Sequence, residues 1–145
     1  MKIKLLNDLA KIPTRGSDYA AGWDLYAATN KEITIYPHET VKVGTGIAIE
    51  IPDPNCFGAI FARSGIATKQ GLRPANCVGV IDADYRGELI VAFHNDTDQM
   101  QVVEAGSRIA QLVILPFVDI NNFEVVDELS DSERGEQGFG SSGIF

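Results

Sequence analysis

Short runs of alternating apolar and polar residues, each closed by Gly, Pro, Asn or Asp, recur along this chain of 145 residues. The run Glu-Ile-Thr-Ile-Tyr at 32–36 is the clearest, since its apolar side chains would all point to one face of a strand. Other runs of strand length occupy 3–5, 40–43, 47–51, 56–61, 88–94, 109–117 and 123–126. Many short strands separated by turn residues predict an all-β protein: a β-sandwich, a jelly roll or a barrel.

Helical patterns are scarce. The best candidate is Ser64–Gln70, at most two turns long. Ser64 is expected to cap its N-terminus, and Gly71 to end it, because Gly readily adopts the left-handed conformation of a C-cap.

The composition fits one domain with a different C-terminal stretch. Hydrophobic residues make up 45% of the chain and charged residues 22%, which is ordinary for a globular protein with one core. Residues 127–145 are first acidic and then rich in Gly and Ser, so they cannot form a core of their own. We therefore expect a β-domain over 1–126 and a mobile segment over 127–145.

Charge and cysteine content exclude several classes of protein. The net charge of −8 repels a phosphate backbone and argues against general nucleic-acid binding, so a small anionic substrate would need a local cluster of cationic groups. No stretch approaches the roughly 20 apolar residues that cross a membrane. Cys56 and Cys77 lie in apolar runs and are expected to be free thiols in apolar surroundings, which indicates a reducing, cytoplasmic compartment.

Two carboxylates are candidates for a functional role. Asp24 follows Ala-Ala-Gly-Trp; a solvated loop carboxylate is the simpler interpretation, and an anchor for Mg²⁺ is the alternative. Asp82 lies among Val80, Ile81 and Tyr85 in a hairpin, where we expect it to be partly desolvated. A carboxylate in such a setting can act as a general base.

Three further segments carry groups that bind phosphate. Arg63, Ser64 and Gly65 begin the short helix and offer a guanidinium group, a hydroxyl and backbone N–H groups, although an N-cap followed by a loop would look the same. Gln111 interrupts an apolar run, either as a satisfied core amide or as a phosphate donor. The tail, 134–143, spaces one Arg, one aromatic ring and two hydroxyls with glycines, the groups needed to close over a base and a polyphosphate.

In this order and spacing, the five segments resemble the five motifs of the trimeric dUTPase family. The specific parts are the hairpin Gly-Val-Ile-Asp-Ala-Asp-Tyr-Arg-Gly-Glu and the tail, which reads Arg-Gly, two residues, then Gly-Phe-Gly-Ser-Ser-Gly. The resemblance covers residues 2–143 and implies a distorted jelly roll or β-sandwich with one short helix. It also implies a homotrimer with shared active sites that hydrolyses dUTP to dUMP and pyrophosphate with Mg²⁺.

The resemblance implies a role for each matching residue. Asp82 would activate water for attack on the α-phosphorus, Tyr85 would leave no space for a 2′-hydroxyl, and Asp24 would hold Mg²⁺ through water. Uracil and deoxyribose would be bound by Asn76, Gly79, Val80, Ile81, Tyr85, Ile90 and Phe139. The phosphates would be bound by Arg63, Ser64, Gly65, Gln111, Arg134, Gly140, Ser141 and Ser142. The roles of Arg86 and Arg108 stay open.

Two other functions compete with this one. A dCTP deaminase of the same superfamily would need an acid/base group near C4 of the base, usually a Glu in its hairpin, where this chain has Asp-Ala-Asp-Tyr. A catalytically silent jelly-roll protein that binds a nucleotide or a regulatory partner would be expected to lack Asp82 or the tail, and this chain has both.

Overall fold

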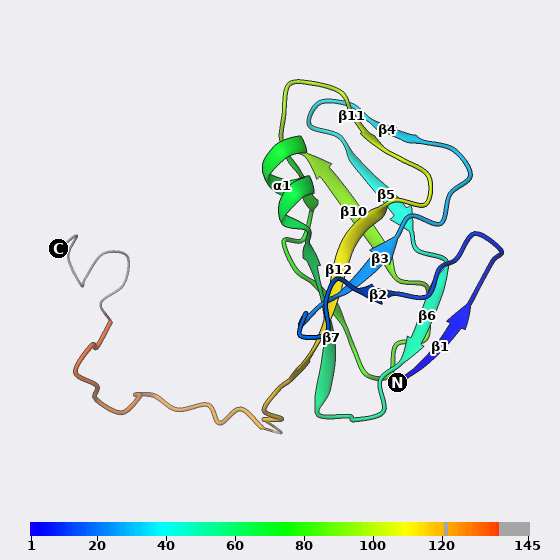
Figure 1. Cartoon of the computed structure of the whole chain (residues 1–145). Coiled ribbons are helices and arrows are strands. Elements are labelled where there is room, and N and C mark those ends of the chain that lie inside the picture. The colour runs from blue at the N-terminus through cyan, green and yellow to red at the C-terminus, as the bar shows by residue number, and fades with distance from the viewer. Residues whose placement is uncertain (121, 137–145) are drawn as a thin grey trace.

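The protein is an all-β jelly roll with one short helix, as the sequence predicts (Figure 1). The computed structural model describes residues 1–120 and 122–136. Its strands are β1 (Lys2–Leu5), β2 (Thr14–Arg15), β3 (Trp23–Tyr26), β4 (Ile33–Ile35), β5 (Thr40–Gly44), β6 (Ile47–Glu50), β7 (Cys56–Ala62), β8 (Leu72–Pro74), β9 (Gly79–Ile81), β10 (Ile90–Asn95), β11 (Gln101–Val103) and β12 (Arg108–Pro116).

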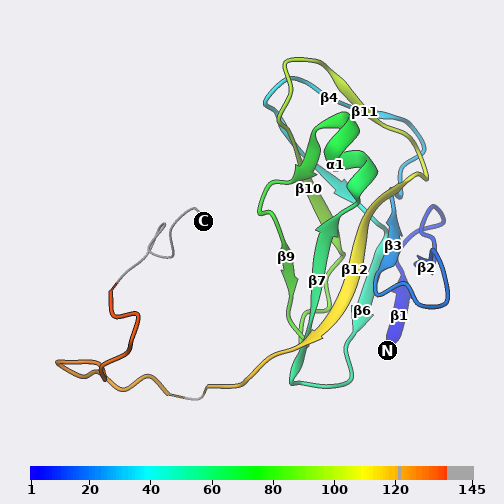
Figure 2. The ribbon, with the colours of Figure 1, turned by 60° about the vertical axis from the view of Figure 1, so that its left-hand side comes forward.

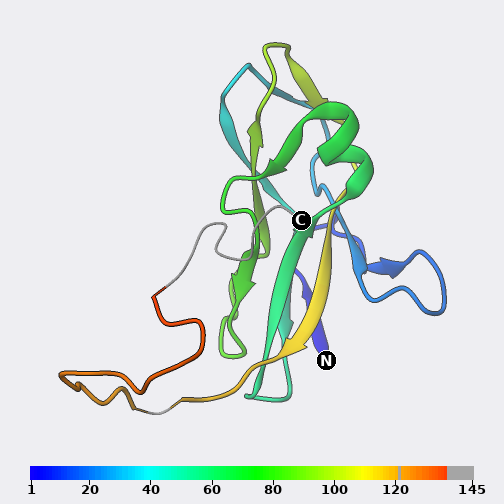
Figure 3. The ribbon, with the colours of Figure 1, turned by 90° about the vertical axis from the view of Figure 1, so that its left-hand side faces the viewer.

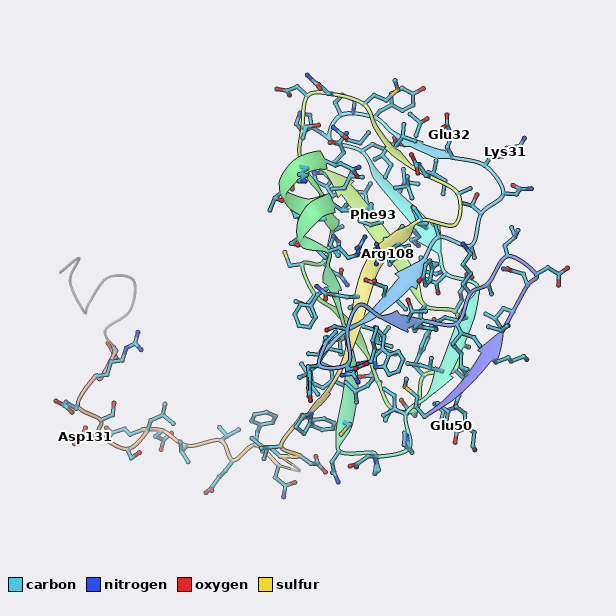
Figure 4. All side chains as sticks on the ribbon, viewed as in Figure 1. Lys31, Glu32, Glu50, Phe93, Arg108 and Asp131 are labelled. Carbon is cyan, nitrogen blue, oxygen red and sulfur yellow. The ribbon has the colours of Figure 1, made fainter. Side chains whose placement is uncertain are left out.

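The largest sheet has the strand order β2-β3-β12-β7-β9, and its strands carry Asp24, Gln111 and Gly79–Ile81 of the predicted site. A second sheet runs β5-β10-β8, and β1-β6 and β11-β4 form two-stranded pairs. Figure 2 shows β9, β7 and β12 side by side along one flank of the molecule. Apolar side chains from these sheets meet in one core, in which Phe93, Leu25 and Leu112 are fully buried; Figure 4 shows Phe93 inside the body.

The single helix, α1 (Ser64–Gln70), has the predicted bounds but a different N-terminus. Its N-cap is Arg63, in extended conformation and without a side-chain cap, so the expectation that Ser64 caps the helix is wrong. Ser64 is instead the first helical residue. Gly71 ends the helix at φ 64°, as expected.

The expected strand at 123–126 is wrong for the single chain: within residues 1–120 and 122–136 no strand pairs with it, and Phe123 and Val125 are 92% and 98% exposed. Beyond the end of β12, the described residues of the C-terminal arm (residues 118–120 and 122–136) run away from the β-domain (Figures 1 and 3). Figure 4 shows Asp131 on this arm, far from the core residue Phe93. The separation of a β-domain, 1–126, from a lid, 127–145, stays a prediction.

No helix among the described residues is both long and apolar enough to cross a membrane. Both cysteines are free thiols. Cys56 is half-buried, and this burial raises the pKa of its thiol. Cys77 is exposed in a turn at φ 63°, so the expectation of apolar surroundings is confirmed for Cys56 only.

Candidate functional site

A cavity of about 270 Å³ lies beside residues 76–90, the segment that was expected to form a hairpin. Its strands β9 and β10 belong to different sheets, because β9 pairs with β7 and β10 pairs with β5 and β8, so the expected pairing within the hairpin is wrong. We keep the word hairpin for this segment. It contains Asp82 and all six described residues that were predicted to bind the base and sugar. The full lining is Ile60, Pro74, Asn76, Gly79, Val80, Ile81, Asp82, Tyr85, Glu88, Ile90, Val91 and Ala92. We call this space the hairpin cavity. Its walls are mainly apolar, with the Asn76 amide, the Tyr85 hydroxyl and two carboxylates among them, which suits a flat, polar-edged ring.

Asp82 lies at this cavity, but it is exposed in the single chain, so the expected partial desolvation is wrong for one subunit alone. Its backbone carbonyl accepts a hydrogen bond from the N–H of Tyr85 at 3.1 Å, which closes the tight turn of the hairpin. Arg86 donates to the carbonyl oxygens of Ala83 and Tyr85 and so braces the same turn. The structure therefore fixes the backbone around Asp82 and leaves its carboxylate open to solvent.

A second, more polar pocket of about 690 Å³ brings together the predicted phosphate residues Arg63, Ser64, Gly65 and Gln111, with Asp24 and Arg108. We call it the arginine pocket. Asp24 is largely buried and joins two cations: Arg63 Nε lies 3.0 Å from its Oδ1, and Arg108 Nη1 lies 3.1 Å from its Oδ2. Arg63 also donates to the carbonyl of Arg108 at 3.0 Å. Two guanidinium groups and one carboxylate leave this cluster with a net positive charge inside an acidic protein.

Gln111 lies directly opposite Asp24 across the β12–β3 pair. Its Nε2 donates to the carbonyl oxygen of Ala62 at 2.9 Å. One N–H of an amide group is used in this bond, and an amide group has two. The side chain is thus anchored and still has a donor for a second partner.

The two pockets lie on opposite faces of the large sheet. They share no lining residue, yet Ile60 lines the hairpin cavity and the next residue, Phe61, lines the arginine pocket. Both belong to β7, and successive side chains of a strand point to opposite faces. The register agrees, because Ile60 pairs with Gly79 and Phe61 pairs with Gln111. One chain therefore does not bring its own predicted base residues and phosphate residues to one place.

The donor set fits a Mg²⁺ ion held through water rather than a metal cage. Among the described residues, no three His, Cys, Asp or Glu side chains group closely enough to hold a metal ion. Mg²⁺ commonly binds through one or two carboxylates, waters and substrate phosphates. Each oxygen of Asp24 already accepts from an arginine, but a carboxylate has about four acceptor positions, so it can still accept from a metal-bound water.

The remaining predicted residues do not line either pocket. Arg134 lies on the C-terminal arm, away from the β-domain. Phe139, Gly140, Ser141 and Ser142 lie outside the described residues. Glu88 and Arg108 also line the pockets, although neither residue was assigned a role from the sequence. For Arg108 no local signal exists, because its partner Asp24 lies 84 positions away.

An ion pair supports the wall of the hairpin cavity from behind. Arg73 binds Asp96 through two hydrogen bonds, of 2.6 and 3.0 Å, and also donates to the carbonyl of Pro74, a cavity residue. The hydrogen bond from Arg73 lowers the pKa of the Asp96 carboxyl group, and the same bond raises the pKa of Arg73. Charge-assisted, two-point pairing of this kind holds both side chains in one geometry.

Fold and pockets together define an all-β jelly-roll protein with a hairpin cavity on one face of a sheet and an arginine pocket on the other. The family model for dUTPase matches residues 8–143. This chain belongs to the dUTPase family.

Relatives and solved structures agree along nearly the whole chain. The deoxyuridine 5'-triphosphate nucleotidohydrolase of Desulfitobacterium hafniense (strain DSM 10664 / DCB-2) is 49% identical over 134 residues, which cover 92% of this chain and 88% of the relative. That of Legionella pneumophila (strain Paris) is 44% identical, covering 97% and 91%. The dUTPase of Staphylococcus bacteriophage 80alpha, solved with dUPNHPP, matches with a TM-score of 0.88 at 32% identity and covers 99% of this chain and 98% of its own.

The pair behind the hairpin cavity gives a pH-dependent prediction. The pKa of Asp96 is depressed by folding, so its contribution to stability is present above the unfolded pKa and is lost as the pH falls through the folded pKa. Replacing Asp96 with Asn should lower the thermal unfolding temperature at neutral pH, and the difference from wild type should shrink in acid. Scanning calorimetry at one protein concentration over a pH series measures this. Asp8→Asn, at an exposed carboxylate, is the control; a pH-independent difference for Asp96→Asn would contradict the prediction.

Proposed function

We propose that this protein is a dUTP diphosphatase that hydrolyses dUTP to dUMP and pyrophosphate with Mg²⁺, keeping uracil out of DNA and supplying dUMP for thymidylate synthesis. The observation that supports it best is the hairpin cavity, which the predicted base-binding residues line together with Asp82. The two free thiols support a reducing, cytoplasmic location.

Uracil is bound in the hairpin cavity by the Asn76 amide and by backbone groups near Val80 and Ile81. Cytosine presents a donor where uracil presents an acceptor, so it would leave buried groups without partners, which is a strong basis for rejection. The ring of Tyr85 packs against deoxyribose and leaves no space for a 2′-hydroxyl. A cavity of about 270 Å³ between Pro74, Ile90 and the hairpin supports recognition of one flat ring.

The triphosphate is bound in the arginine pocket by Arg63, Ser64, Gly65 and Gln111. Asp24 would hold Mg²⁺ through water. The ion would neutralise the charge of the phosphates and orient the triphosphate for in-line attack by water. The buried carboxylate of Asp24 also keeps the guanidinium group of Arg63 in place, so the donors are fixed before the substrate arrives.

Hydrolysis begins when Asp82 accepts a proton from a water molecule that attacks the α-phosphorus. The bond from water oxygen to phosphorus forms while the bond to the bridging oxygen of pyrophosphate breaks, and pyrophosphate leaves with the electron pair. The proton taken by Asp82 returns to solvent after release. The short, braced turn around Asp82 supports this role, because it holds the carboxylate beside the mouth of the cavity.

The placement of the two pockets supports a homotrimer with shared sites. The base residues and the phosphate residues of one chain lie on opposite faces of its sheet, so a nucleotide needs the hairpin cavity of one subunit and the arginine pocket of another. We infer three subunits from the family resemblance.

The C-terminal arm supports this assembly. Val118, Ile120, Phe123 and Val125 are between 65% and 98% exposed, although they are large and apolar. An apolar segment of this length that leaves its own domain is stable in water only if another surface covers it. We infer that the arm docks on a neighbouring subunit. It then carries the lid, 127–145, to the active site that the other two subunits form. There Phe139 would stack over uracil while Arg134, Gly140, Ser141 and Ser142 reach the phosphates.

The decisive experiment measures pyrophosphate release from dUTP, dCTP, dTTP and UTP, with and without Mg²⁺. Only dUTP with Mg²⁺ should be cleaved rapidly, because the cavity rejects the other bases and the ribose. In water labelled with ¹⁸O, the label should enter dUMP and not pyrophosphate, since attack is on the α-phosphorus. Ammonia release from dCTP would instead indicate a deaminase, and nucleotide binding without cleavage would indicate a silent binding protein.

Replacing Asp82 with Asn removes the base and keeps the shape. The value of kcat should fall by about 10²–10⁴-fold, with the affinity for dUMP nearly unchanged. Asp84→Asn is the matched control, because Asp84 is an exposed carboxylate of the same hairpin outside the cavity lining. Steady-state kinetics with dUTP and calorimetric titration with dUMP make the comparison. Normal turnover by Asp82→Asn would show that Asp82 is not the base.

Charging the arm should break the assembly. Replacing Phe123 and Val125 with Asp puts two charges where we expect contact with a neighbour, so light scattering should report monomers in place of trimers, with loss of dUTP hydrolysis. Glu124→Gln, which removes a charge between the same two residues, should leave the trimer and its activity unchanged. A trimer that persists with full activity in the double variant would exclude docking of the arm.

A further inference from the structure

Glu88 is the second carboxylate of the hairpin cavity, and hydrolysis as described above does not use it. Its Oε1 accepts a hydrogen bond of 2.7 Å from the backbone N–H of Gly46, in the turn between β5 and β6. The carboxylate lies so close to Gly44 that a Cβ there would be 2.5 Å from Oε1. The side chain of Glu88 is therefore clamped against a turn that is more than forty positions away in sequence.

The backbone of Glu88 in turn holds Tyr85. The hydroxyl of Tyr85 donates to the carbonyl oxygen of Glu88 at 3.1 Å. Between them, Gly87 must be glycine in this arrangement, because the Tyr85 ring occupies the space that a Cβ would need. Glycine is the most flexible residue of the backbone, so the position of the Tyr85 ring depends on what fixes the chain just after it.

The turn between β5 and β6 is also hydrogen-bonded to Leu89, the residue after Glu88. The N–H and the hydroxyl of Thr45 both donate to the carbonyl of Leu89, at 3.1 and 2.7 Å, and the N–H of Leu89 donates to Ile47 at 2.9 Å. These bonds fix residue 89. The Leu89 N–H belongs to the same planar peptide group as the carbonyl of Glu88, so its bond to Ile47 holds that carbonyl from one side. The carboxylate of Glu88 adds a second attachment of the same residue to the turn.

We propose that Glu88 is a positioning residue for sugar selection: clamped by the N–H of Gly46, it fixes the Tyr85 ring that excludes a 2′-hydroxyl. Loss of the clamp frees the segment between Tyr85 and Glu88 at its glycine, and the ring moves away from the sugar. Room for ribose then appears, so the preference for deoxyribonucleotides falls while the base contacts of Asn76 persist. This inference rests on the role of Tyr85 proposed above.

The test is the affinity of the assembled protein for dUMP and for UMP, measured by calorimetric titration, which requires neither turnover nor a metal ion. Glu88→Ala should lower the preference for dUMP over UMP by about tenfold or more, the effect of one charge-assisted hydrogen bond. Glu88→Gln should keep most of the preference, because its amide oxygen can accept the same bond from Gly46.

A substitution at Gly44 tests the contact of Glu88 with Gly46 in a second way. Gly44→Ala should displace the carboxylate of Glu88 and reproduce the loss, and it carries the test alone if Glu88→Ala does not assemble. In the double variant Gly44→Ala/Glu88→Ala, the new methyl group meets no carboxylate, so the loss should equal that of Glu88→Ala and not the product of both. Thr45→Val is the matched control: it should lower the unfolding temperature and leave the preference intact.

The outcomes separate this inference from the proposed function. Equal affinity of the wild-type protein for dUMP and UMP would overturn the role of Tyr85, and the inference with it. A wild-type preference that survives both Glu88→Ala and Gly44→Ala, or losses that multiply in the double variant, would overturn the role of Glu88 alone.

Discussion

The antiparallel pairing of β7 with β12 determines where every candidate group of the β-domain lies. Seven consecutive residues of each strand face one another, and β9 is added on the far edge of β7. Because side chains alternate along β7, the pairing sends Ile60 toward the hairpin cavity and Phe61 toward the arginine pocket. A slip of one residue would exchange these faces and bury the wrong side chains. The same register that builds the core thus divides the chemistry between two surfaces.

Both pockets also depend on close packing of polar groups against backbone without side chains. In the hairpin cavity the carboxylate of Glu88 lies against Gly44, and in the arginine pocket Oε1 of Gln111 would be 2.8 Å from a Cβ at Gly22. At each position any larger residue would push away a polar side chain whose other contacts are fixed. Glycine at these two places serves the sites more than the backbone conformation, since neither φ is in the left-handed region.

Local sequence patterns predicted much of this fold. The alternation at 32–36, 40–43 and 47–51 gave three strands close to their observed bounds, and Gly71 correctly ended the helix. These features depend on neighbours in sequence. The strand predicted at 123–126 did not form because a strand needs a partner, and no strand of the described part of the chain pairs with it.

Long-range contacts account for what the sequence could not predict at the site. The motifs grouped Asp82 with the base residues and Arg63 with Gln111, and the structure has each group in one pocket. The sequence did not reveal that Asp24 bridges Arg63 and Arg108, because the bridge depends on the β3–β12 pairing. Nor could it reveal that Glu88 is held by Gly46, since that contact joins two turns through the sheet.

The exposure of Asp82 in a single chain connects assembly with catalysis. A general base works best where bulk water is excluded, because the low dielectric strengthens its interaction with the developing charge. In one subunit its carboxylate faces solvent, and the positive cluster of Arg63 and Arg108 lies on the other face of the sheet. In the proposed trimer a neighbour's arginine pocket would close over Asp82, and the lid from a third chain would cover the nucleotide. Each subunit then contributes an incomplete site, so an isolated chain would bind neither the triphosphate nor the attacking water in productive geometry. This arrangement also accounts for how a protein of net charge −8 attracts a polyanion: the positive charge is concentrated at one pocket, and it meets the base pocket only where subunits join.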